Sequence, residues 1–203
     1  MENTMKKMLN KEDMQKNQEK FRMWGEALDA LRADHIEKQQ RGLHFMIPSV
    51  LLWLLIFGIQ FLPVSLYHRN LLVFCTSALL MPMALICAKL LGVVFSNKGN
   101  PLNGLGILFT LNQMVYLLIV MWAFSQSPVS MVMLYAIVFA AHLLPFGWLY
   151  RSKVYTVFSI LEAFAALILG CLFGGAAVAA ATAAMQFVLA IGLSGELRTR
   201  YSK

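Results

Sequence analysis

A small set of polar and ionisable side chains interrupts otherwise apolar stretches of this sequence, and these residues have the chemistry of a site. An ionised side chain near the centre of a bilayer costs roughly 2.5–3.5 kcal/mol, so such residues usually face one another or water. Glu162 can carry a negative charge, Lys89 can be its ion partner, and His142 titrates near neutral pH. The candidate residues of this polar pocket are Lys89, Asn112, Gln113, Tyr116, His142, Glu162 and Gln186.

Long apolar runs must position these side chains. From Leu43 onward, runs of about twenty residues alternate with short polar or Gly/Pro breaks, and lipid offers the backbone of such a run no partner except its own helix. The sequence therefore predicts an all-α, polytopic membrane protein with six transmembrane helices. Their expected ranges are 43–62, 71–95, 105–124, 130–150, 154–173 and 176–194.

Two features of these runs allow more than one structure. The break at Gly174-Gly175 is the weakest, so the last two runs form either a tight hairpin or one long, kinked helix. Pro82 and Pro145 lie inside runs and remove backbone hydrogen bonds there. We expect kinks at both prolines, with the freed carbonyls satisfied by neighbouring groups or water.

The distribution of basic residues predicts the orientation. The chain is 59% hydrophobic and only 13% charged, with a net charge of +7. If the breaks are assigned alternately to the two sides of the membrane, the Lys and Arg residues collect on one side and only Arg69 falls on the other. Positive residues stay on the untranslocated side, so we expect both termini in the cytoplasm. The same bias accounts for the basic charge without a nucleic-acid partner.

In this topology, polar residues from five helices fall at a similar depth in the inner half of the membrane. They lie six to eight residues from the cytoplasmic helix ends, or roughly 9–12 Å at 1.5 Å per residue. Small residues at steps of three and four accompany Glu162 and Gln186, so the last two helices are expected to pack through those faces. The hypothesis is an inward-facing pocket for a small polar ligand or a proton. A static interhelical hydrogen-bond network and an intramembrane catalytic site are the alternatives.

Residues 11–41 predict a polar helix with a narrow apolar stripe. Met14, Phe21 and Leu28 are seven residues apart, too short a repeat for a coiled coil. Such a stripe lies on the membrane surface, packs under the bundle, or binds a cytoplasmic partner or a second copy. The candidate partner-binding residues are Phe21, Trp24, Leu28 and Leu31. The expected organisation is an arm over 1–42, the bundle over 43–195 and a basic cytoplasmic tail over 196–203.

Motifs for catalysis or metal binding are absent from the sequence. It contains no HExxH, GxSxG or GxGxxG string and no pair of aspartates inside an apolar run. Cys75, Cys87 and Cys171 lie in apolar runs without CxxC or Cys/His ligand spacing. We expect no cofactor and no metal. One acid, one histidine and one lysine define no reaction class, so the sequence favours a protein that is not an enzyme.

Three strings resemble a known family: Arg41 to Trp53 (RGLHFMIPSVLLW), Phe95 to Leu118 (FSNKGNPLNGLGILFTLNQMVYLL) and Ala141 to Ile160 (AHLLPFGWLYRSKVYTVFSI). They are similar to a family of small bacterial membrane proteins described as a domain of unknown function, number 7010. The resemblance covers roughly residues 35–195. It implies a multi-pass protein of the bacterial plasma membrane and carries no activity with it.

Two functions remain as hypotheses from the sequence. The first is a small transporter-like or ligand-binding bundle in which Glu162 and His142 are the titrating groups. The alternative is a membrane-anchored regulatory or scaffold protein whose N-terminal helix binds a partner.

Overall fold

The structure is a computed structural model whose backbone is described from residue 2 to residue 201 and whose side chains are described from residue 13 to residue 199. The basic residues Lys6, Lys7, Lys11, Arg200 and Lys203, which entered the charge count, have side chains outside that range. Every regular element in the described part is a helix, so the all-α prediction is confirmed. The helices are α1 (Glu2–Gln39), α2 (Leu43–Ile59), α3 (Leu66–Ser77), α4 (Leu80–Leu91), α5 (Leu102–Gln126), α6 (Met131–Leu149), α7 (Lys153–Leu172) and α8 (Gly175–Tyr201), with short 3-10 helices η1 (Gln40–Gly42) and η2 (Pro128–Ser130).

The described residues contain six helical segments long and apolar enough to cross a membrane, which confirms the predicted number. The segments are Asp13–Ile59, Leu66–Leu91, Leu102–Gln126, Pro128–Leu149, Lys153–Leu172 and Gly175–Thr199. In the first of them the apolar part is α2, whereas the α1 part is polar. The outer faces carry large apolar side chains: Phe164, Ile168 and Leu172 on α7 are each more than half exposed. Such a surface can face the acyl chains of lipid at no cost, whereas exposing it to water costs free energy.

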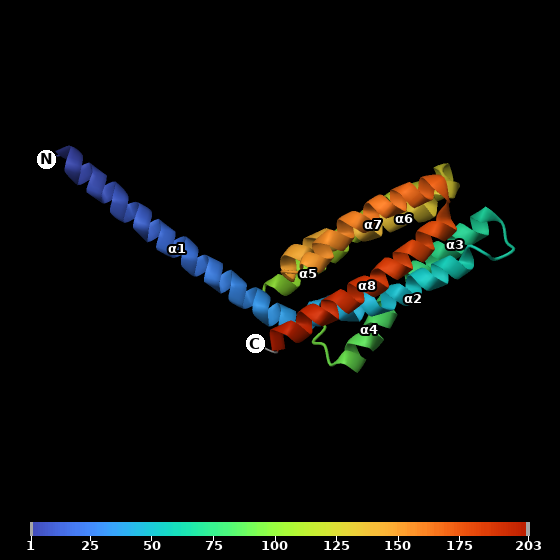
Figure 1. Ribbon diagram of the computed structural model, residues 1–203, viewed down its shortest axis with the longest axis horizontal. Helices are drawn as coiled ribbons and strands as arrows, with labels where there is room; N and C mark the ends of the chain where they lie inside the picture. Colours follow the sequence, from blue (N-terminus) through green and yellow to red (C-terminus); the bar gives the residue numbers. More distant parts are fainter. Residues whose placement is uncertain (1, 202–203) are drawn as a thin grey trace.

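The bundle consists of two groups of helices that α8 connects (Figure 1). Helices α5, α6 and α7 form one group, and α2, α3 and α4 form the other; α8 packs against α2 and also against α6 and α7. The core lies between the groups. There the ring centroid of the buried Trp53 of α2 is 5.2 Å from the ring centroid of Tyr135 and 5.6 Å from that of Phe139, both on α6. Aromatic pairs at this separation stabilise a core beyond the effect of their buried area.

The second apolar run is broken near its middle. The sequence predicts one helix over 71–95, whereas the structure has α3 and α4 with a turn at Ala78 and Leu79. Pro82 has no N–H, so the Ala78 carbonyl loses its helical donor. The amides of Ala78 and Leu79 instead bond three residues back, at 3.1 and 3.0 Å. The expected proline effect therefore appears as a break between two helices, while Pro145 lies inside the continuous α6.

The last two helices form a tight hairpin, one of the two structures that the sequence allows. Gly174 has a left-handed backbone (φ +81°), which glycine adopts without a side-chain clash. Its amide donates to the Leu169 carbonyl at 3.1 Å and thereby satisfies the end of α7. The chain then reverses directly into α8, which brings Glu162 and Gln186 to neighbouring helices.

A sharp turn separates α1 from α2. Three consecutive residues, Gln40, Arg41 and Gly42, have positive φ angles of 45°, 52° and 74°. As a result α1 does not continue α2 but projects away from one end of the bundle, and the C-terminal end of α8 lies at that same end (Figure 1).

Candidate functional site

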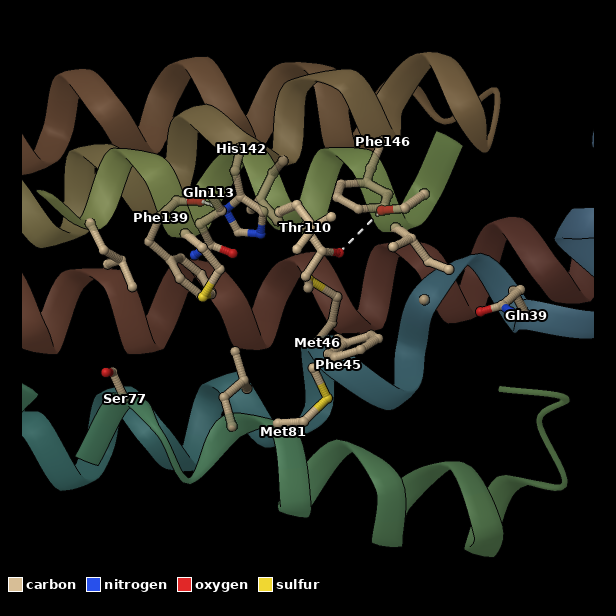
Figure 2. Close-up of a pocket in the computed structure, with 18 of the residues that line it drawn as sticks. Gln39, Phe45, Met46, Ser77, Met81, Thr110, Gln113, Phe139, His142 and Phe146 are labelled. Atoms are coloured by element: carbon tan, nitrogen blue, oxygen red, sulfur yellow. Dashed lines mark hydrogen bonds between the residues drawn. The ribbon is translucent and has the colours of Figure 1, made fainter. Parts of the chain in front are cut away.

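A cavity of about 730 Å³ lies between the two groups of helices (Figure 2). One wall comes from α2, α3 and α4 and includes Phe45, Met46 and Met81; the opposite wall comes from α5 and α6 and includes Phe139 and Phe146. Most lining side chains are apolar or aromatic. A cavity of this size and composition, with few polar groups, is typical of small-molecule sites in proteins.

Two buried polar side chains lie on the α5–α6 wall. Gln113 of α5 is 7% exposed and His142 of α6 is 9% exposed, and both point into the cavity (Figure 2). On α5, the lining residues Gly106, Thr110 and Gln113 recur at steps of four and three, so a single face of the helix forms this wall.

The hydrogen bonds of His142 determine which of its nitrogens is available. Its Nδ1 bonds to the carbonyl oxygen of Phe139, one turn earlier on α6. Since a carbonyl only accepts, Nδ1 carries the proton and Nε2 is left as an acceptor. Among the described residues, no side chain or carbonyl bonds to Nε2, and the Gln113 amide has no hydrogen-bond partner either.

The end of the cavity nearest α1 is also polar. His35 and Gln39 of α1 and Asn103 of α5 line it. The His35 ring stacks on the Tyr150 ring at 5.5 Å, and the Gln39 amide donates to the carbonyls of Val94 and Phe95 at 2.9 and 3.1 Å. The last turns of α1 therefore close this end of the cavity.

Glu162 and Gln186 lie together but outside this cavity. The Gln186 amide donates to Glu162 Oε2 at 2.7 Å, and the Ser49 hydroxyl lies 3.0 Å from Gln186 Oε1. None of the three side chains is exposed, and they join α7, α8 and α2. The expected packing of the last two helices through their Glu162 and Gln186 faces is confirmed. The three residues form a dry interhelical cluster, which resembles the static network among the sequence alternatives.

The remaining candidates of the polar pocket face away from both sites. Lys89 of α4 and Asn112 and Tyr116 of α5 are exposed. The described residues show no ion pair between Lys89 and Glu162, because α4 packs on α2 whereas Glu162 is buried between α7 and α8. The single polar layer expected from the sequence is thus divided into a cavity wall, a buried cluster and an outer surface.

A third group of polar contacts holds the end of α1 against the bundle. Arg41 donates to the Tyr150 carbonyl at 2.6 Å and forms an ion pair with Glu196 of α8 at 3.0 Å. The Tyr155 hydroxyl donates to the Arg41 carbonyl at 2.8 Å. Glycine is favoured at position 42 because φ is positive there and an added Cβ would lie 3.0 Å from the Tyr155 hydroxyl oxygen.

The loop between α4 and α5 is attached to α1 through Asp34. The Asn97 and Asn100 amides each donate to Asp34 Oδ2 at 2.8 Å, and Lys38 lies 2.7 Å from Oδ1. Asp34 lies on the arm, outside the apolar bundle. The hydrogen bonds from Lys38 and Asn100 hold the pKa of the Asp34 carboxyl below its usual value.

The candidate partner-binding residues of the arm differ in exposure. Phe21 and Trp24 are 65% and 55% exposed and form an edge-to-face pair with ring centroids 5.5 Å apart. Leu28 and Leu31 are only half-buried, because α1 approaches the bundle from Asp29 onward. The apolar stripe is therefore free over its first part and packed against the protein over its last part.

Several cavity residues were not among the candidates from the sequence, namely His35, Gln39, Ser77, Asn103, Thr110 and Tyr135. A signal existed for α5, where Gly106, Thr110 and Gln113 have the same small-and-polar spacing that identified the α7–α8 contact. No spacing pattern in the sequence could have identified the α1 residues as cavity residues, since their position depends on the turn at Gly42. Across the described residues, no three His, Cys, Asp or Glu side chains converge to hold a metal ion.

These features define an α-helical polytopic membrane protein with an internal, mostly apolar cavity. The chain belongs to a family of unknown function (DUF7010), whose model matches residues 28–196. The resemblance noted in the sequence is thereby confirmed. The match begins at the point where α1 first contacts the bundle. No curated protein and no solved structure matches the chain.

Proposed function

We propose that this protein is a membrane-embedded ligand-binding protein of transporter-like architecture, whose cavity takes an apolar small molecule. The observation that carries this proposal is a cavity of about 730 Å³ into which two buried side chains, Gln113 and His142, point. Among the described residues, neither the Gln113 amide nor His142 Nε2 has a hydrogen-bond partner. Buried polar groups without partners cost free energy. A ligand that supplies those partners therefore gains binding free energy.

The position of the charged residues supports an apolar ligand over an ion or a sugar. No Asp, Glu, Lys or Arg within the described part lines the cavity. Glu162, the acid expected to bind a proton or a polar ligand, lies in the dry cluster instead. A charged solute needs compensating charged groups along its path, and the apolar lining of the cavity offers none.

For the location, we propose the bacterial plasma membrane with both termini in the cytoplasm. The excess of basic residues in alternate breaks supports this orientation. The position of α1 and the C-terminal end of α8 at the same end of the bundle agrees with it (Figure 1).

The proposal is tested by photolabelling the full-length purified protein with a compact aryl diazirine. We expect mass spectrometry to find adducts on inward residues such as Gln113 and Leu143. Ala78→Trp, at the cavity wall, should reduce these adducts severalfold, and Ala184→Trp, at an exposed position on α8, should not. Adducts confined to lipid-facing residues such as Phe164 would show that the cavity takes no such ligand.

A second function, partner binding by the arm, is favoured by one observation. Phe21 and Trp24 are exposed on the part of α1 that projects away from the bundle. Trp24→Ser should abolish crosslinks between the arm and a cytoplasmic protein or a second copy of this chain. The matched control is Met23→Ser, because Met23 is equally exposed but lies on another face of the helix. Equal crosslinking of both variants would remove this function.

A further inference from the structure

Resting on the proposed function, we infer that the natural ligand is a neutral lipophile with a hydroxyl group, an alcohol or a phenol. Its hydroxyl would donate to His142 Nε2 and accept from the Gln113 amide, while its apolar body fills the remaining cavity and enters sideways from the lipid between α4 and α5. Four observations support this ligand class.

The first observation is the acceptor at His142. Because Nδ1–H is used by the Phe139 carbonyl, only a ligand with an O–H or N–H can bond to Nε2. A ketone, an ester or an ether has no such hydrogen. A carbonyl compound would leave Nε2 without a partner in a mostly apolar cavity, which costs free energy.

The second observation is the neighbouring amide. Gln113 lies on α5, which packs on α6, and its amide and the His142 ring point from the same wall toward the same part of the cavity (Figure 2). An amide both donates and accepts, as a hydroxyl does. One hydroxyl can therefore satisfy His142 as donor and Gln113 as acceptor at the same time.

The third observation is the absence of charge. The described cavity lining has no Asp, Glu, Lys or Arg side chain, and Lys89, the candidate cation of the sequence, is exposed on α4. A carboxylate or phosphate in this cavity would be a buried ion without a counter-ion, which costs several kcal/mol. The ligand must therefore be neutral.

The fourth observation is the shape and opening of the cavity. Along α5 it extends from Asn103 to Leu117, which is roughly 20 Å at 1.5 Å per residue. Its side wall includes Met81 of α4 and Ile107, Leu111 and Met114 of α5, all at least 44% exposed. These residues belong to the surface that lipid covers, so an elongated ligand reaches the cavity from the bilayer and needs no aqueous route.

The test compares two photoreactive probes in vesicles that contain the full-length protein. One is a long-chain primary alcohol that carries a diazirine, and the other is its methyl ether. The ether keeps the acceptor for Gln113 but has no hydrogen for His142. We expect the alcohol to label the cavity residues of wild type about tenfold more than the ether, equivalent to about 1.4 kcal/mol.

Three variants show which residues cause the difference in labelling between the two probes. His142→Phe should bring the alcohol-to-ether ratio close to one, and Gln113→Leu should weaken labelling by both probes. Asn112→Leu is the matched control, because Asn112 is the exposed neighbour of Gln113 on α5, and it should behave as wild type. If His142→Phe fails to fold, the wild-type ratio and Gln113→Leu still decide the question.

The outcomes separate this inference from the proposed function. Equal labelling of the wild-type cavity by alcohol and ether would overturn the hydroxyl requirement and leave ligand binding intact. If the alcohol, the ether and the compact aryl diazirine all labelled outer residues alone, ligand binding itself would be overturned.

Discussion

The side-chain amide of Gln186 donates to Glu162 Oε2 over 2.7 Å at a place where neither side chain is exposed. This bond joins α8 to α7 in the apolar bundle, and Ser49 of α2 lies on the other side of Gln186. Glu162 Oε1 has no hydrogen-bond partner among the described residues. The acid is therefore only partly satisfied, and its chief partner is neutral, which makes its ionised form costly to bury.

Replacement of Glu162 by glutamine should leave the protein as stable as wild type or more stable. The amide oxygen of the new side chain still accepts from Gln186, and a buried carboxylate is no longer required. The thermal unfolding midpoint of the detergent-purified protein measures this. Gln186→Leu is the contrasting variant, and it should cost about 1–3 kcal/mol because Glu162 then loses its donor. A large loss of stability in Glu162→Gln would contradict this account of the cluster.

Gly147→Ala should destabilise the contact between α6 and α7. A Cβ at this position would overlap the Thr156 hydroxyl and lie 3.1 Å from the Thr156 amide nitrogen, which is backbone and cannot rotate away. Overpacking of this kind costs about 1–3 kcal/mol. Gly58→Ala is the matched control, since nothing lies within 4 Å of its added Cβ, and it should be neutral or stabilise α2 by up to about 1 kcal/mol. Equal unfolding midpoints for the two variants would show that α6 and α7 can separate.

The helices of this protein follow from the sequence because the length and polarity of an apolar run determine whether it can cross a membrane. The contact between Glu162 and Gln186 also follows, since spacing assigns each residue to the small-residue face of its own helix. The single polar layer did not follow. Similar depth says nothing about the direction in which a side chain points, and Lys89 and Asn112 point outward.

The cavity itself depends on geometry that no local pattern contains. The break of the second run before Pro82 and the turn at Gly42 set the positions of α4 and α1. The two walls are far apart in sequence, and the distance between them is fixed by how α8 packs on α2, α6 and α7. Only the α5 wall, with Gly106, Thr110 and Gln113 on one face, had a pattern that indicates its place.

The attachment of the α4–α5 loop to α1 should depend on pH through Asp34. Because its carboxylate is hydrogen-bonded in the folded protein, its pKa is below the usual value of 3.8. A lowered pKa means that the contribution to stability is complete above pH 3.8 and disappears as the pH falls through the lowered value. The unfolding midpoint of Asp34→Asn should lie below that of wild type at pH 7, and the two should converge as the pH falls below 3.8. A difference that persists at the lowest pH would exclude the carboxylate as its cause.

Removal of residues 1–27 should leave the bundle intact. The side chains of residues 13–27 are exposed, and the ion pair between Arg22 and Glu26 lies within α1 itself. The first contacts with the bundle begin at Asp29, whose carboxylate is 2.9 Å from Arg151. The unfolding midpoint and the photolabelling of the cavity by the aryl diazirine should both equal those of the full chain.

A longer deletion, of residues 1–36, provides the contrast. It removes the Asp29 ion pair, the stacking of Arg32 on Trp148 at 3.6 Å and the hydrogen bond from Asn100 to the Leu31 carbonyl at 2.8 Å. It also removes His35, which closes the cavity at its α1 end. We expect this variant to unfold at a lower temperature and to lose labelling of the cavity by the aryl diazirine. If the shorter deletion had the same effects, residues 1–27 would contribute to the stability of the bundle, contrary to the exposure of residues 13–27.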